Sequence, residues 1–205
     1  MTRSVAALAL ATLSAGAVPD HQDLLAARTK GRADAPVVVY EMADFQCPAC
    51  RVFAVQTMPL IEREYIATGK VRWVYVHFPL MSIHPNAAAA AEVATCAARQ
   101  GKFWRLHDLL YEYQEEWASL AEPTSYFQAL GDSVGLDRAR LAACVEGNTA
   151  RGEVEADAAR AVRSGARSTP SFYIEGGLLK GAYPIAVFRQ VLDSIYRNKR
   201  PAGRG

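Results

Sequence analysis

This 205-residue sequence is poor in net charge, histidine and long apolar runs. Its 23 basic and 21 acidic residues leave a formal charge of +2, too little to predict an electrostatic track for nucleic acid. Zinc sites need histidines or a second cysteine pair at fixed spacing, and we predict no metal site from His21, His77, His84 and His107. No segment has the continuous apolar length of a membrane span, and we find no repeat.

The N-terminus has the pattern of an export signal. Arg3 precedes the apolar run VAALALATL, and Ala15 and Ala17 follow in an A-x-A arrangement. The run is too short to cross a bilayer. We therefore predict a signal peptide over residues 1–17 and a periplasmic or other extracytoplasmic location. An ordinary Ala/Leu-rich helix, retained in a cytosolic protein, is the alternative.

Cysteine is also scarce, and only two of the four cysteines are close in sequence. Cys47 and Cys50 form a CxxC pair directly after the run VVVYEMA, which predicts a buried strand over residues 37–43. Helical spacing follows, with Pro59 expected to kink the helix, and KVRWVYVHFPL predicts a second strand. The cysteine pair thus lies at a strand-to-helix junction inside a βαβ unit.

This placement has a chemical consequence for the two thiols. A helix N-terminus presents unpaired N–H groups and a partial positive charge, which both favour a thiolate. Cys47 should therefore be more nucleophilic at neutral pH than a free thiol, whose pKa is about 8.5. Cys50, one turn further into the helix, can attack a mixed disulfide formed at Cys47 and release the partner. The pattern predicts a redox-active dithiol.

The rest of the chain changes character twice. Helical spacing without a convincing strand extends over residues 86–165. STPSFYIEGGLLKGAY then predicts two strands joined by the turn EGG, and Pro184 begins a last amphipathic helix. The outline is β-α-β over residues 18–85, a helical block over 86–165, and β-β-α over 166–205, which ends in a basic tail.

Three stretches together resemble a known family: ADFQCPACR, HFPLMSIHPNAAAAAEVATCAARQGKFWRLHDLLYEYQ and STPSFYIEGG. They are similar to the DsbA-like thiol:disulfide oxidoreductases of the thioredoxin superfamily, and the resemblance covers residues 32–197. It implies an α/β thioredoxin fold, in which helices flank a central mixed β-sheet, with an inserted all-helical subdomain. CxxC alone is a weak signal, whereas the three stretches as a set are highly specific.

The resemblance also implies roles for individual residues. Cys47 corresponds to the exposed nucleophilic cysteine and Cys50 to the resolving one. Pro170 corresponds to the cis-proline that faces the CxxC, and Thr169 would offer its backbone to an extended substrate peptide. Glu41 matches an acidic position beneath the active site that is thought to help proton transfer.

The sequence departs from the best-known members in the dipeptide between the cysteines. These members have Pro-His, whereas this chain has Pro48-Ala49, so a donor or positive charge near the thiolate is missing. The oxidising power is therefore left open. Thr169 also resembles the residue before the cis-proline in related isomerases. Those isomerases have an N-terminal dimerisation domain, for which too few residues precede the first strand, so we expect a monomer.

The remaining cysteines, Cys96 and Cys144, lie in the helical block. Free buried cysteines are one possibility, because unpaired cysteine is among the most buried residue types. An oxidising compartment permits a cross-link, and some relatives have a second disulfide near these positions. We predict a structural Cys96–Cys144 disulfide.

These observations predict an exported enzyme that introduces disulfide bonds into unfolded or partly folded proteins through Cys47 and Cys50. No cofactor is needed, and reoxidation is expected from a membrane quinone-linked partner of the DsbB or vitamin K epoxide reductase (VKOR) type. A reductase or isomerase with the same catalytic pair is the nearer alternative. A non-catalytic binding or chaperone module is the more distant one, and a buried Cys47 would point to it.

Overall fold

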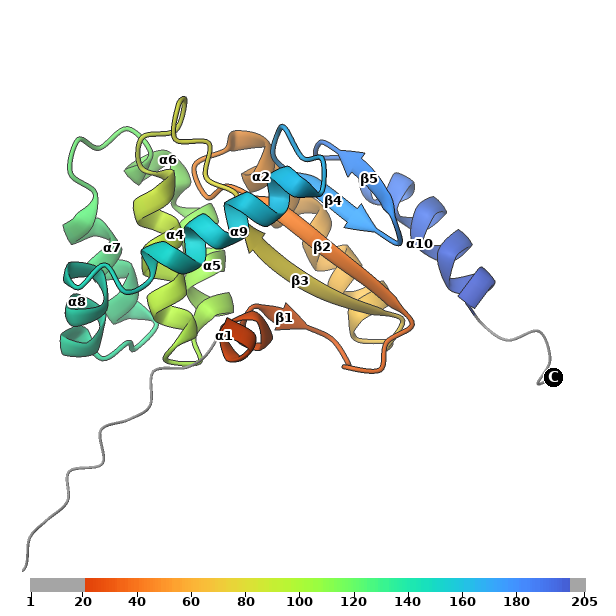
Figure 1. Ribbon diagram of the computed structural model, residues 1–205, viewed down its shortest axis with the longest axis horizontal. Helices are drawn as coiled ribbons and strands as arrows, with labels where there is room; N and C mark the ends of the chain where they lie inside the picture. The colour runs from red at the N-terminus through yellow and green to blue at the C-terminus, as the bar shows by residue number, and fades with distance from the viewer. Residues whose placement is uncertain (1–20, 200–205) are drawn as a thin grey trace, which may run out of the picture.

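A computed structural model describes residues 21–199, so the predicted signal peptide and the end of the basic tail lie outside the described residues. Five strands form one sheet in the order β1-β3-β2-β4-β5 (Figure 1). β2 and β3 are parallel, as a βαβ connection requires, and the other neighbours are antiparallel. The strands are Thr29–Lys30 (β1), Val37–Ala43 (β2), Val71–His77 (β3), Ser171–Ile174 (β4) and Gly177–Lys180 (β5). The expected mixed sheet is confirmed.

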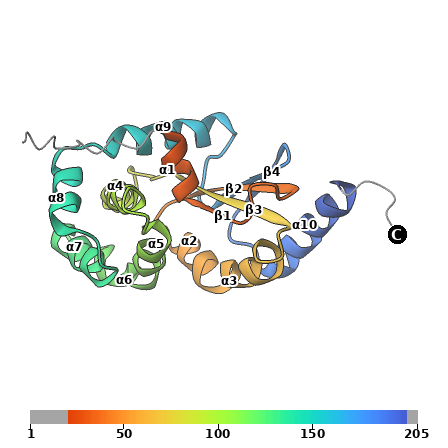
Figure 2. The same cartoon turned by 90° about the horizontal axis from the view of Figure 1, so that it is seen from below.

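Helices cover both faces of this sheet (Figure 2). Side chains alternate along β2, so Val37 and Val39 face the side of α2, α3 and α10, whereas Met42 faces α1 and α9. On the first face Phe53, Trp73, Phe172 and Phe188 form an aromatic cluster with ring centroids 4.6–6.3 Å apart. The helices named here are His21–Ala27 (α1), Pro48–Val52 (α2), Met58–Ile61 (α3), Arg151–Arg163 (α9) and Ile185–Lys199 (α10).

The helix that follows the CxxC is interrupted near Pro59. Two π-helical turns, Phe53–Thr57 and Glu62–Ile66, flank α3, and Pro59 lies in the first turn of α3. Proline lacks an N–H and its ring clashes with the carbonyl four residues earlier, so the α-helical hydrogen bonding cannot continue through this position. The wider π turn before Pro59 accommodates this conflict.

The helical insert lies at one end of the sheet (Figure 1). Its last helix, α9, also packs against β3, so this helix belongs to the cover of the sheet as well. The core of the insert continues to the cysteine pair, because Cys50 and Tyr75 share one buried cluster with Leu106 and Tyr111. The other helices of the insert are Ala87–Ala98 (α4), Phe103–Glu112 (α5), Gln114–Trp117 (α6), Thr124–Ser133 (α7) and Arg138–Glu146 (α8).

A disulfide joins two helices of the insert. Cys96 on α4 is bonded to Cys144 on α8, with the two Cα atoms 6.0 Å apart and the two residues 48 positions apart in sequence. A cross-link that closes a loop of this length typically stabilises a fold by about 2–4 kcal/mol. The bond is therefore suited to holding α8 against α4. Within residues 21–199, no helix has the length and apolarity that crossing a membrane requires.

Candidate active site

The cysteine pair occupies the first turn of α2. Cys47 is the N-cap residue, with extended backbone angles (φ −74°, ψ 121°). Pro48 follows in the first turn, where a backbone N–H would have no helical partner, so proline costs no hydrogen bond. Cys47 keeps 7% of its surface exposed and Cys50 keeps none, whereas Pro48 and Ala49 are exposed. Both thiols are free. Only Cys47 can be approached from outside the molecule.

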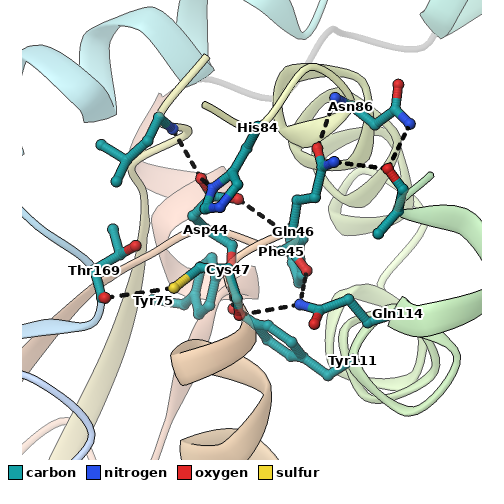
Figure 3. Close-up of polar contacts among 12 residues, drawn as sticks. Asp44, Phe45, Gln46, Cys47, Tyr75, His84, Asn86, Tyr111, Gln114 and Thr169 are labelled. Atoms are coloured by element: carbon teal, nitrogen blue, oxygen red, sulfur yellow. Dashed lines mark hydrogen bonds and ion pairs between the residues drawn. The ribbon is translucent and has the colours of Figure 1, made fainter. Parts of the chain in front are cut away.

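The surroundings of Cys47 stabilise its thiolate. Its pKa is lowered to about 6, chiefly because the Cys50 thiol donates a hydrogen bond to it. The side chain of Thr169 and the backbone N–H groups of Ala49 and Cys50 lower the pKa further, while partial burial opposes them. In the thiol form Cys47 can instead donate to the Thr169 carbonyl oxygen, 3.4 Å from its sulfur (Figure 3). At pH 7 the thiolate is the main form.

The second cysteine has the opposite electrostatics. Burial raises the pKa of Cys50 well above its usual range, and its interactions with Cys47 and the charge of Glu41 raise it further. Cys50 is therefore a thiol at neutral pH, able to donate its proton to the Cys47 thiolate. The two sulfurs therefore form an asymmetric pair, in which Cys47 is the nucleophilic thiolate and Cys50 is an unreactive thiol.

Glu41 lies on β2, on the same side of the sheet as the aromatic cluster. It is fully buried, and burial raises its pKa to about 7. The indole Nε1 of Trp73 donates to its Oε2 at 2.7 Å, and the charge of Lys30 also opposes the rise. A buried carboxyl group with this pKa can both give and take a proton at neutral pH.

The predicted substrate-binding loop also reaches this site. The Thr169–Pro170 peptide bond is cis, both residues are buried, and the carbonyl of Thr169 faces Cys47. The fold therefore brings together the cysteine pair, its dipeptide, Glu41 and this loop. Cys96 and Cys144 lie apart from them, within the insert.

Sequence reasoning misses a buried carboxylate beside the cysteine pair. Asp44 Oδ1 accepts from the backbone N–H of Gln46 at 2.8 Å, and its Oδ2 accepts from Leu80 N at 2.8 Å and contacts His84 Nδ1 at 2.7 Å (Figure 3). From the sequence, His84 is expected only at the start of a helix. An aspartate three residues before Cys47 is typical of a side-chain-capped turn, which is the signal that could have found it.

Three amide side chains near the same turn are also missed. Gln46, Asn86 and Gln114 are buried, and they lie far apart in sequence. No spacing or composition rule connects such residues, because each bonds to backbone groups rather than to another side chain. Among residues 21–199, no group of three or more His, Cys, Asp or Glu side chains is arranged to hold a metal ion.

Comparison with known proteins assigns the family. Residues 25–194 match the thioredoxin family. The chain is 32% identical over 152 residues to the probable disulfide bond formation protein D of Bacillus anthracis. The aligned region covers 72% of this chain and 69% of that protein. The chain belongs to the thioredoxin family. Within it, the chain is a member of the DsbA-like thiol:disulfide oxidoreductases.

The chain is also similar to a solved structure and to part of a longer protein. The crystal structure of oxidised BdbD from Bacillus subtilis superposes with a TM-score of 0.76 over 83% of this chain and 92% of that one, at 22% identity, which supports the fold. The Na(+)/H(+) antiporter NhaA 3 of Salinispora tropica is 34% identical over 171 residues, or 83% of this chain. The chain spans 25% of that antiporter's length.

Proposed function

We propose that this protein is an exported oxidase that forms disulfide bonds in unfolded or partly folded proteins. The observation that carries the proposal is the asymmetry of the pair. The pKa of Cys47 is lowered to about 6, while that of Cys50 is raised well above its usual range. When the thiolate of the reduced pair is stabilised, the disulfide form of the pair gains a stronger tendency to accept electrons from other thiols.

The reaction is two successive thiol exchanges. A substrate thiolate attacks the sulfur of Cys47 in the Cys47–Cys50 disulfide, forms a mixed disulfide, and displaces Cys50. A second substrate thiolate then attacks the substrate sulfur of the mixed disulfide and displaces the Cys47 thiolate. The substrate loses two electrons and gains a disulfide, and the pair is left reduced. Cys47 is a good leaving group in the second step because its thiolate is stable.

The first step needs a proton for Cys50. A buried thiolate with a strongly raised pKa is a poor leaving group, so the displacement is faster when a proton arrives as the bond breaks. Glu41 is buried, couples electrostatically to Cys50 and has a pKa of about 7. We assign Glu41 the role of proton donor in this step and proton acceptor when the pair is oxidised again.

Substrate and partner follow from the same chemistry. An extended substrate segment would pair with the backbone of Thr169 beside the cis Pro170, with little sequence selectivity. Each turnover leaves a dithiol, so an electron acceptor is required, and a quinone-linked membrane protein of the DsbB or VKOR type fits. We propose a monomer outside the cytoplasm that uses no cofactor.

Two other functions remain to be separated by experiment. A reductase or isomerase would use the same cysteines, and Ala49 favours it because alanine adds no donor beside the thiolate. A binding or chaperone module is favoured by the small exposure of Cys47, 7% of its surface. The oxidase accounts better for a low pKa at the more exposed cysteine of the pair.

A stoichiometric oxidation assay tests the proposal. The oxidised protein is mixed with a reduced, unstructured peptide containing two cysteines, and both products are counted by mass after thiol alkylation. We expect one peptide disulfide for each Cys47–Cys50 pair reduced. Oxidation that fails, together with rapid insulin reduction by the dithiol form, would indicate a reductase. Inertness in both directions would indicate a binding module.

Replacing Glu41 with glutamine separates its role in the reaction from its effect on stability. Because the folded pKa of Glu41, about 7, exceeds the usual value of 4.5, the fold prefers the protonated form. The contribution of Glu41 to stability should thus fall between pH 4.5 and 7, by roughly 2–4 kcal/mol in all. We expect Glu41→Gln to be the more stable protein at pH 8 by about this amount, equal to wild type near pH 4, and slower in its first exchange step.

Urea unfolding at several pH values and stopped-flow exchange measure these effects. Glu112→Gln, which changes an exposed carboxylate on α5, is the control and should alter neither. A Glu41→Gln protein that exchanges at the wild-type rate would remove Glu41 from the proton path, and unchanged pH dependence of stability would mean that its pKa is ordinary.

A further inference from the structure

A side-chain amide of the helical insert hydrogen-bonds to the turn that carries Cys47. Gln114 on α6 is 3% exposed, and its Nε2 donates to the carbonyl oxygens of Phe45 at 2.6 Å and Cys47 at 3.0 Å (Figure 3). Both hydrogens of one amino group are used in this way. The Phe45 carbonyl belongs to the peptide before Gln46 and the Cys47 carbonyl to the peptide after Cys47, so a single side chain fixes the two peptide planes that enclose Gln46 and Cys47.

Two more amides extend this contact. Gln46 Oε1 accepts from the backbone N–H of Asn86 at 2.6 Å, and its Nε2 donates to the Ala118 carbonyl at 2.7 Å. Asn86 Nδ2 in turn lies 2.9–3.3 Å from the carbonyl oxygens of Trp117, Ala118 and Leu120. We call Gln46, Asn86 and Gln114 the amide clamp. It ties the turn before α2 to the start of α4 and to the chain after α6.

The clamp acts on the carbonyl that sets the direction of the reactive sulfur. As the N-cap residue, Cys47 accepts the first helical bond from Arg51 N at 3.1 Å, and the second lone pair of the same oxygen receives Gln114. Fixing this carbonyl fixes the backbone rotation at Cys47. That rotation determines whether the sulfur faces the N–H groups of Ala49 and Cys50, which stabilise its thiolate.

We propose that Gln114 is a positioning residue for Cys47, and that the helical insert sets the reactivity of the cysteine pair through the amide clamp. Gln114 does not contact the sulfur and acts only through the backbone. The inference rests on the proposed function, in that Cys47 is taken as the reacting thiol. It gives the insert a role in the chemistry, in addition to covering the end of the sheet.

Gln114→Met tests the proposal, because methionine has nearly the same shape and no donor. We expect the pKa of Cys47 to rise by about one unit, and the exchange equilibrium with glutathione at pH 7 to become about fivefold, or about 20 mV, less oxidising. The ultraviolet absorbance of the thiolate during a pH titration gives the first quantity, and glutathione equilibration gives the second. Neither depends on substrate turnover.

Gln100→Met is the matched control. Gln100 also bridges backbone groups within the insert, since its Oε1 accepts from Asp137 N at 2.8 Å and its Nε2 donates to Asp137 O at 3.4 Å. Its loss should lower the melting temperature and leave the pKa of Cys47 unchanged. A general loosening of the insert would affect both variants alike.

Gln46→Met provides the second test, since it breaks the bonds to Asn86 and Ala118 and keeps those of Gln114. It should shift both quantities in the same direction by less, and it decides the question if Gln114→Met does not fold. A folded variant with the wild-type pKa and equilibrium overturns the proposal and makes the clamp purely structural. Failure of the proposed function differs, because the wild-type protein itself would then show an ordinary Cys47 pKa or a reducing potential.

Discussion

Replacing Cys50 with alanine is expected to turn the protein into a trap that binds one substrate covalently and does not release it. The Cys47 thiolate remains at the start of α2, where the Thr169 side chain and the helix N–H groups still lower its pKa, although the hydrogen bond from Cys50 is lost. It can attack an accessible disulfide and form a mixed disulfide. The sulfur that would normally resolve this adduct is absent, so turnover is abolished.

Incubation of Cys50→Ala with an unfolded protein containing disulfides measures this effect. A non-reducing gel should show one covalent adduct for each molecule of the variant, and dithiothreitol should release it. Cys47→Ala should form no adduct, because Cys50 is fully buried and its pKa is raised. An adduct through Cys50 in that control, or turnover by Cys50→Ala, contradicts the division of roles between the two sulfurs.

Replacing Asp157 with asparagine is expected to cause the largest loss of stability among the substitutions considered. Asp157 on α9 is fully buried, and its Oδ2 accepts from the guanidinium of Arg28 and from His77 N at 3.1 Å. Its Oδ1 accepts from Arg160 at 2.8 Å. The carboxylate thus links the segment after α1, the end of β3 and α9. Asparagine would leave the Arg28 charge buried without a counter-charge, which costs about 3–5 kcal/mol.

Urea unfolding at pH 7 gives the free energy directly, and two controls identify its source. Asp132→Asn removes a carboxylate from an exposed pair with Arg138 and should lower stability by less than about 1 kcal/mol. The double variant Arg28→Leu/Asp157→Leu removes both buried charges, and we expect it to be more stable than Asp157→Asn. If Asp157→Asn matches the exposed control, the buried pair has no special importance for the fold.

Much of the fold can be predicted from local sequence patterns. The run VVVYEMA coincides with β2, and Glu175 and Gly176 of EGG form the turn between β4 and β5, because strand propensity and turn residues act over a few neighbouring positions. The segments α1 and β1 are not predicted. β1 has two residues, and its pairing with β3 depends on Val74 and Trp73, which are far away in sequence.

The residues of the site also divide into those with a local sequence signal and those without one. The cysteine pair, Pro170 and Glu41 are predictable, because a motif and its family resemblance mark their positions. Gln114 is not, since its partners are backbone groups that only the folded chain brings near. For Asp44 only the local turn has a sequence signal, and its contacts with Leu80 and His84 form only in the folded chain. Nor can the sequence give the surroundings of Glu41, whose raised pKa comes from complete burial beside Trp73.

The reduction potential of the Cys47–Cys50 pair tests the central claim most directly. The protein is equilibrated with glutathione buffers, the thiols are alkylated, and peptide masses report this pair separately from Cys96–Cys144. A stabilised Cys47 thiolate predicts a potential less negative than about −180 mV, in the range of oxidising members of the family. A value near or below about −270 mV, that of thioredoxin, would contradict the oxidase and indicate a reductase or a structural bridge.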